Sequence, residues 1–277
     1  FDKAAILCID GVGEWATTSV WLGENSKLTP LWEINFPHSL GLLYSAFTAY
    51  LGFTVNSGEY KLMGLAPYGE PKYVDLILDQ LIDLKEDGTF HLNMRYFSYA
   101  TQLSMTNKRF ATLFGAPPYQ SKSDLSKHKA DVASSIQVVT EEIILRLVRT
   151  IHKELKIDNL CLAGGVALNC VANGRIARES PFKQLWIQPA AGDAGGALGS
   201  ALSVWYEYLE QNRTTLNPDA MQGAYLGPHY NNKEIIDYLE SKNIAYQQLE
   251  DKQLLPKVAE IIASDNVVGW FQGRMEY

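Results

Sequence analysis

One candidate binding residue is a carboxylate that directly follows an apolar run near the start of the chain. Asp10 comes after residues 4–9 and is followed by Gly11 and Gly13. A carboxylate in this position can hold a metal ion, and the glycines let backbone N–H groups approach a phosphate. Asp-Gly is equally typical of a hairpin turn, so a plain turn remains an alternative to a metal or phosphate site.

A second carboxylate has similar surroundings. Asp193 opens a predicted helix that also contains Gly195, Gly196 and Gly199. A glycine inside a helix costs roughly 1 kcal/mol relative to alanine, so three of them suggest close approach of a ligand or of another backbone. Asp193 could bind a metal ion, or it could be only the N-cap of this helix.

Gly164 and Gly165 stand where an apolar run, residues 160–163, meets a predicted helix. Such a junction lets a nucleotide lie against the backbone and the start of the helix. The segment matches neither G-x-G-x-x-G nor the P-loop pattern, and a plain tight turn would explain it as well.

Two basic side chains are further candidates. Lys61 lies in a segment with Gly58, Gly64 and Gly69 that we expect to be a loop, where an ammonium group could neutralise a phosphate or simply face solvent. His38 precedes a predicted helix start and could face a substrate or have a structural role. The other four histidines show no metal-ligand spacing and are expected at the surface.

Strands and helices must position these residues. Apolar and β-branched runs predict an antiparallel meander over 6–9, 17–22 and 31–36, and then a helix over 39–52 with Ser39 as N-cap. Further on, we expect a helix over 72–84, a strand over 89–94 and a long helix over 124–155. Strand–turn–helix units that begin at 160 and 185 indicate parallel strands with crossover helices.

A change of pattern near Asn217-Pro218 suggests a domain boundary within 211–224. We expect a first domain over 1–215 and part of a smaller α/β domain over 221–277, with helices at 232–242 and 253–264 and strands at 244–249 and 267–271. The first residues open almost directly into a strand and the last ones lack a terminal helix, so the sequence is expected to be a fragment.

Composition limits the kind of protein. The chain has 277 residues, 47% of them hydrophobic, and a formal net charge of −7 without a basic stripe, which disfavours nucleic-acid binding. Three cysteines without a C-x-x-C pair favour a reducing compartment, the cytoplasm, over a disulfide scaffold or a zinc site. The uncharged stretch 34–58 contains Pro37 and many polar residues, so a buried helix is expected there rather than a membrane span.

Taken together, the motifs resemble those of the O-carbamoyltransferases that act on nodulation factors and antibiotics. The resemblance extends over essentially the whole chain and rests on segments 10–14, 37–69, 163–169 and 189–200, with 273–277 similar to the start of a fifth. It implies an actin/sugar-kinase-like (ribonuclease H-like) superfold followed by part of a smaller α/β domain that handles carbamoyl phosphate.

The resemblance also implies a reaction and its ligands. Carbamoyl phosphate and ATP would form carbamoyl-adenylate, from which the carbamoyl group passes to the hydroxyl of a small-molecule acceptor. A divalent metal, Fe(II), would be held by two histidines and two aspartates, which match Asp10 and Asp193 by position. By the same resemblance, the cofactor-binding positions are Gly11, Gly13, Gly164, Gly165, Asn169, Gly195 and Gly196, and the catalytic ones are Lys61, His38 and Arg274.

The sequence departs from this pattern at two points. The upstream His-x-x-x-His segment that would complete the metal site is not in it, and neither is the stretch beyond 277 expected to add basic residues for carbamoyl phosphate. A kinase or other ATPase of the same superfold, or a non-catalytic nucleotide-binding module, therefore remain alternatives. The sequence identifies no acceptor and leaves open whether the protein forms a homodimer.

Overall fold

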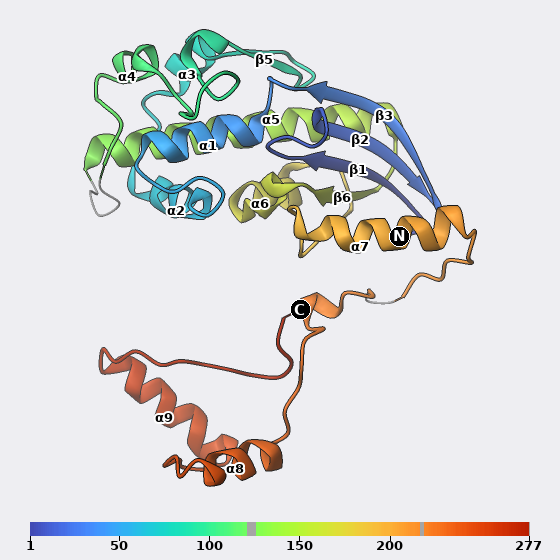
Figure 1. The fold of residues 1–277 in the computed structure, drawn as a ribbon, viewed down its shortest axis with the longest axis vertical. Coiled ribbons are helices and arrows are strands. Elements are labelled where there is room, and N and C mark those ends of the chain that lie inside the picture. Colours follow the sequence, from blue (N-terminus) through green and yellow to red (C-terminus); the bar gives the residue numbers. More distant parts are fainter. Residues whose placement is uncertain (121–125, 217–218, 277) are drawn as a thin grey trace. The chain divides into compact units, whose positions relative to one another are not determined.

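The computed structural model describes residues 1–120, 126–216 and 219–276 of a chain that folds as two compact units, Phe1–Thr214 and Thr215–Tyr277 (Figure 1). The predicted break at Asn217-Pro218 lies outside the described residues. No helix in the described part of the chain is both long and apolar enough to cross a bilayer.

A five-stranded mixed sheet forms the centre of the first unit, with strand order β3-β2-β1-β6-β7. Strand β2 runs antiparallel to both of its neighbours, whereas β1, β6 and β7 are parallel to one another. The predicted meander and the predicted parallel units are therefore both confirmed. The strands are β1 (Lys3–Ile9), β2 (Ala16–Glu24), β3 (Lys27–Asn35), β6 (Asn159–Ala163) and β7 (Gln184–Ile187).

Helices α1 (Leu40–Tyr50), α5 (Lys127–Leu155) and α6 (Cys170–Glu179) pack together against this sheet (Figure 1). The long α5 buries its predicted apolar stripe, which includes Val132, Ile136, Val139, Ile143, Leu147 and Ile151. The expected beginning of this helix, at 124, lies outside the described residues. Alternate residues of β1, namely Ala5, Leu7 and Ile9, are fully buried against the helical layer, as the period of a strand requires.

The expected loop over 57–70 is wrong, because residues Glu59–Leu65 form helix α2, followed by a short 3₁₀ turn at Ala66–Tyr68. The glycines that suggested a loop serve tertiary contacts instead. A Cβ at Gly58 would lie 2.6 Å from the carbonyl oxygen of Thr54, and one at Gly69 would clash with the carbonyl oxygen of Ala130. Leu62 and Leu65, three positions apart, bury one face of α2.

The helix expected over 72–84 is shorter than predicted. Helix α3 (Val74–Gln80) ends before β4 (Ile82–Leu84), which pairs antiparallel with β5 (Phe90–Leu92) in a separate two-stranded ribbon. Ile82 and Leu92 face each other and are buried, so tertiary packing decides a segment whose apolar spacing fits either structure. A 3₁₀ turn at Met94–Tyr96 and helix α4 (Lys108–Leu113) complete this region, and a further 3₁₀ turn at Gly165–Leu168 lies between β6 and α6.

The last helix of the first unit begins where the glycines predicted it. Helix α7 (Ala194–Ser203) continues directly into a π-helical turn at Val204–Tyr208. Neither segment contains a buried residue, and Leu202, Val204 and Trp205 are among the exposed apolar side chains.

The second unit contains a 3₁₀ turn at Gln222–Ala224 and the helices α8 (Asn232–Ser241) and α9 (Asp251–Ala263), both close to the predicted ranges. The strands predicted over 244–249 and 267–271 are wrong, since neither range forms a strand among residues 219–276. A strand needs a partner for its backbone hydrogen bonds, and these ranges have none in this unit. A pair of backbone hydrogen bonds joins 227–228 to Met275, at 2.9 and 3.1 Å.

Candidate functional site

The candidate site lies at the carboxyl ends of β1 and β6, which are neighbouring parallel strands. Cys8 and Ala163 are the last paired residues of these strands. Gly164 directly follows Ala163, and Asp10 comes two residues after Cys8. The two turns therefore meet at one edge of the sheet. A Cβ built on Gly165 would lie 3.2 Å from Oδ1 of Asp10, which places the Asp10 carboxylate beside the second glycine.

The Asp10 turn is a hairpin connection that is fastened to the start of α1. Its backbone bonds run from Asp10 N to the carbonyl oxygen of Thr17 and from Gly13 N to that of Ala16, each 2.9 Å. The Gly11 N–H donates to Asp10 Oδ1 at 2.7 Å. The structure thus confirms a hairpin at this position, while the carboxylate makes no ion pair with any described residue.

Ser39 joins this turn to α1. Its hydroxyl oxygen lies 3.0 Å from the carbonyl oxygen of Asp10 and 2.6 Å from that of Gly11, and it accepts the Leu42 N–H at 3.0 Å as the predicted N-cap. The side chain is fully buried. The start of α1 is therefore in direct contact with the turn that carries Asp10.

Gly164 is required by the packing of the strands. Its φ is +85°, and a Cβ there would lie 2.2 Å from the carbonyl oxygen of Ile9, so only glycine fits. Its N–H donates to the carbonyl oxygen of Ala191 at 2.8 Å, which draws the segment after β7 to the same edge. The N–H groups of the next two residues, Gly165 and Val166, have no acceptor among the described residues.

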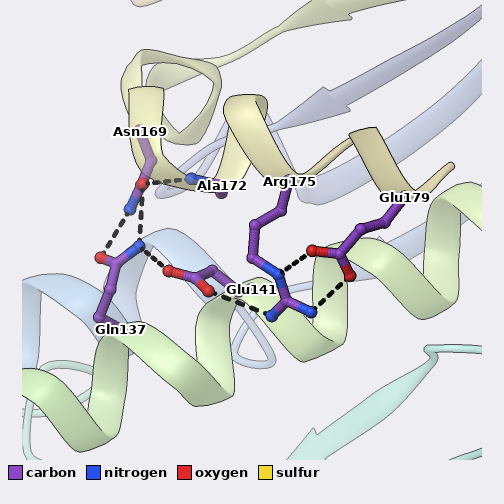
Figure 2. A network of polar contacts seen from close by, with 6 residues as sticks. All are labelled: Gln137, Glu141, Asn169, Ala172, Arg175 and Glu179. Atoms are coloured by element: carbon purple, nitrogen blue, oxygen red, sulfur yellow. Dashed lines mark hydrogen bonds and ion pairs between the residues drawn. The ribbon is translucent and has the colours of Figure 1, made fainter. Parts of the chain in front are cut away.

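Asn169 ends this turn and begins α6. Its Oδ1 accepts the N–H of Ala172 at 3.0 Å and therefore caps the helix (Figure 2). Its amide also pairs with the amide of Gln137 on α5 through two hydrogen bonds of 3.0 Å each. Sequence reasoning missed Gln137; the available signal was a polar residue, four positions before Glu141, beside the apolar stripe of α5.

Asp193 and its glycines lie just beyond Ala191. Asp193 is exposed and occupies the N-cap position of α7 without a side-chain hydrogen bond to the helix. A Cβ at Gly195 would lie 2.2 Å from the carbonyl oxygen of Ala190, so this glycine is explained by a backbone contact. Gly196 and Gly199 face open space, where a side chain would meet no described atom.

Lys61 and His38 have different surroundings. Lys61 is exposed on α2, with its ammonium 5.7 Å from the ring centroid of Tyr60. His38 is half-buried: its Nδ1 accepts the Leu92 N–H at 3.0 Å, and its ring packs edge-on against His91 at 4.6 Å. Burial, and secondarily the nearby His91, lower the pKa of His38.

Two of the remaining four histidine predictions are wrong. His91 and His229 are exposed, as expected, but His128 is half-buried between the hydroxyl of Tyr119 at 2.7 Å and the carbonyl oxygen of Phe114 at 2.8 Å. His152 is also half-buried and packs on Phe182. Arg274 belongs to the second unit, where it donates to the carbonyl oxygen of Gly227 at 3.2 Å.

The described residues do not form a complete metal site. Across 1–120, 126–216 and 219–276, no three His, Cys, Asp or Glu side chains gather closely enough to hold an ion. Asp10 and Asp193 would supply two oxygen ligands, whereas a typical protein site for a transition metal uses at least three protein ligands.

Comparison with known proteins identifies the family. The carbamoyltransferase N-terminus family matches residues 1–202. The chain is 66% identical over its full length to a Synechocystis protein described as uncharacterized, sll1178, of which it covers 45%. It is 34% identical to nodulation protein NolNO of Sinorhizobium fredii and 31% identical to nodulation protein NolO of Bradyrhizobium diazoefficiens, in both cases along the whole chain.

The chain spans less than half the length of these relatives: 45% of sll1178, 38% of NolNO and 48% of NolO. The family match covers the hairpin with Asp10, the Gly164-Gly165 turn and the segment at Ala191, which meet at the sheet edge, and also α7. The chain belongs to the carbamoyltransferase N-terminal family.

Proposed function

We propose that the protein is an ATP-dependent O-carbamoyltransferase and that this chain supplies its nucleotide site. One observation carries the proposal: in a member of the carbamoyltransferase family, the Asp10 hairpin and the Gly164-Gly165 turn lie side by side at the carboxyl ends of two parallel strands. Ligands of open α/β sheets bind at such an edge.

The topology supports the proposed actin/sugar-kinase-like superfold. The sheet has the order β3-β2-β1-β6-β7, and β2 alone runs against the other four strands. This is the arrangement expected of one ribonuclease H-like half. In such a half, the phosphates of ATP would lie between the turn that follows β1 and the turn that follows β6.

Named groups of this chain would bind the nucleotide. The N–H groups of Gly165 and Val166, which have no acceptor in the described residues, would donate to phosphate oxygens. Gly196 leaves open space at the start of α7 for close approach of a ligand. Lys61 and His38 remain proposed catalytic groups, and Arg274 is a proposed ligand of carbamoyl phosphate.

Asp10 and Asp193 are proposed metal ligands. A bound divalent ion, Fe(II) in this proposal, would neutralise phosphate charge and polarise the reacting oxygen. Two aspartates are fewer than the three protein ligands of a typical transition-metal site, so the proposal requires further ligands besides Asp10 and Asp193.

The proposed reaction has two stages, formation of carbamoyl-adenylate and transfer of its carbamoyl group. Carbamoyl phosphate and water give phosphate and carbamate, whose oxygen displaces pyrophosphate from the α-phosphorus of ATP to form carbamoyl-adenylate. The acceptor hydroxyl then attacks the carbamoyl carbon, the carbon–oxygen bond to AMP breaks, and the hydroxyl proton passes to a base. The free cysteines support a reducing, cytoplasmic location as part of this proposal.

The test is pyrophosphate release by the full-length protein that contains this chain. With ATP and carbamoyl phosphate together, we expect pyrophosphate and phosphate to appear, and with either compound alone we expect no pyrophosphate. Formation of ADP without pyrophosphate would instead indicate a kinase or ATPase. ATP binding without turnover under both conditions would indicate a non-catalytic module, and either result overturns the proposal.

A further inference from the structure

A buried polar network lies behind the Gly164–Asn169 turn and joins α5 to α6 (Figure 2), and Tyr44 connects it to α1. Tyr44 of α1, Gln137 and Glu141 of α5, and Asn169 at the start of α6 are all at most 8% exposed. Buried polar groups are costly unless they are hydrogen-bonded, so a connected set of this kind is a specific feature of the fold.

Gln137 lies at the centre of the network and uses its whole hydrogen-bonding capacity. Its Nε2 donates to Asn169 Oδ1 at 3.0 Å and to Glu141 Oε1 at 2.8 Å. Its Oε1 accepts from Asn169 Nδ2 at 3.0 Å and from the Tyr44 hydroxyl at 2.8 Å. A glutamine amide has two donors and two acceptor sites, and here all four are used.

The orientation of these amides follows from the charge on Glu141. Its Oε2 accepts a hydrogen bond from the Arg175 guanidinium at 3.1 Å, in an ion pair. An ionised carboxylate can only accept, so Gln137 must turn its Nε2 toward Glu141 and its Oε1 toward Asn169. Asn169 must then present Nδ2 to Gln137 and Oδ1 to the N–H of Ala172.

This chain of constraints reaches the candidate nucleotide turn. Asn169 is the last residue of the turn, and its backbone N–H donates to the carbonyl oxygen of Val166 at 3.0 Å. One hydrogen of Nδ2 is used by Gln137, and the hydroxyl of Tyr44 is a further hydrogen-bond partner of the Asn169 side chain. The network therefore holds the end of the turn whose Gly165 and Val166 N–H groups have no acceptor among the described residues.

We propose that Gln137, oriented by Glu141 and Arg175, is a positioning residue: it fixes Asn169 and thereby the turn whose Gly165 and Val166 N–H groups would bind the nucleotide. The inference rests on the proposed nucleotide site and adds that a residue without contact to the ligand determines its affinity. Replacing the donor group of residue 137 by an acceptor should therefore weaken ATP binding, and a control variant of similarly lowered stability should not show this weakening.

The experiment uses Gln137→Glu in the full-length protein. The new side chain has nearly the same shape, but its ionised form cannot donate to Asn169 or to Glu141. We expect the Kd of a non-hydrolysable ATP analogue to rise about tenfold, the equivalent of roughly one net hydrogen bond. The KM for carbamoyl phosphate should stay unchanged, because the network does not touch that substrate in the proposal.

Lowering the pH supplies a readout that a merely structural role would not change. The neighbouring Glu141 should raise the pKa of the introduced carboxyl group, and its protonated form can donate again. The Kd of Gln137→Glu, relative to the wild type at each pH, should therefore improve on acidification. Gln137→Met, which has no proton to gain, should be weak at every pH.

Ser135→Ala is the matched control on the same helix. Ser135 is buried, and its hydroxyl bonds to the Tyr73 N–H and the carbonyl oxygen of Asp131 rather than to the network, so its removal should lower stability without changing the Kd. An unchanged Kd in Gln137→Glu, an equal rise in Ser135→Ala, or pH-independent weakening in both Gln137 variants would overturn the positioning role.

Direct binding keeps this test separate from the test of the reaction. A wild-type protein that binds the analogue but releases no pyrophosphate would refute the proposed reaction, and the variants would still decide the role of Gln137. A wild-type protein that fails to bind ATP would refute both.

Discussion

Gly41, in the first turn of α1, lies against the backbone of Asp10. A Cβ at position 41 would be 2.6 Å from both the carbonyl carbon and the carbonyl oxygen of Asp10. Two backbone segments that are distant in sequence are thus in contact at the candidate site, and no side chain fits between them.

This contact predicts the effect of Gly41→Ala. Because the clash involves backbone atoms that cannot rotate away, we expect the free energy of unfolding to fall by about 1–3 kcal/mol. Gly64→Ala in α2 is the control, since a Cβ there meets nothing within 4 Å; it should leave stability unchanged or raise it by up to about 1 kcal/mol. Equal effects in urea denaturation would contradict the close approach.

Asp10→Asn separates the charge of Asp10 from its hydrogen bond. Asparagine keeps the Oδ1 that accepts the Gly11 N–H, so the free energy of unfolding should change by less than about 0.5 kcal/mol. If the carboxylate has its proposed role, carbamoyl-phosphate-dependent pyrophosphate release should fall on the order of tenfold or more. Full activity in a normally folded variant would remove Asp10 from the site.

His38 predicts a dependence of stability on pH. Its folded-state pKa is lowered, first by burial and then by His91, so the unfolded state binds the proton more readily. The stabilising contribution is therefore fully present above the unfolded pKa of about 6.5 and is lost as the pH falls through the lower folded value. Chemical denaturation between about pH 5 and about pH 7.5, from roughly 1.5 units below to roughly 1 unit above that reference, measures this slope.

Two variants serve as controls for His38. Asparagine at this position can still accept the Leu92 N–H but does not titrate, so His38→Asn should flatten the slope. His91→Gln removes the second cause of the shift and should reduce it in part. A slope that is identical in all three proteins would show that His38 is not its source.

The cysteines predict one readily reactive thiol. Cys170 is exposed, whereas burial raises the pKa of both Cys8 and Cys161 to about 11, with a smaller contribution from the Asp10 charge at Cys8. Since the thiolate is the reactive form, labelling of the native protein at pH 8 should modify Cys170 first. Cys170→Ser should abolish this fast phase, and survival of the phase would contradict the assignment.

Arg175→Met tests the ion pair at the end of the network. Arg175 lies 3.1 Å from the nearly buried Glu141 and 2.7 Å from Glu179, so its loss leaves a buried carboxylate without its cation. We expect a loss of about 1–3 kcal/mol in the free energy of unfolding. Arg149→Met removes a charge from an exposed position of α5 and should cost much less, so a similar loss in both variants would argue against a specific ion pair.

Much of the fold and the candidate turns could be predicted from local sequence. The apolar runs of the meander, the N-cap Ser39, the stripe of α5 and the strand–turn–helix unit around Gly164 depend on propensities and periodicities that neighbouring residues set. The same local signals mark Asp10, Gly165 and Asn169 as residues of turns next to strands, and the structure brings these turns to one sheet edge.

Only the tertiary structure decided the rest, because the competing local structures have similar free energies until distant residues pack. The segment around Gly58 is a helix since its glycines fit against Thr54 and α5, and residues 82–84 form a strand since β5 is available as a partner. Residues 267–271 have strand-like composition but no partner among the described residues, and so they form no strand. Gln137 likewise contacts Asn169, which is 32 positions away in the sequence, and the periodicity of local sequence cannot predict such a contact.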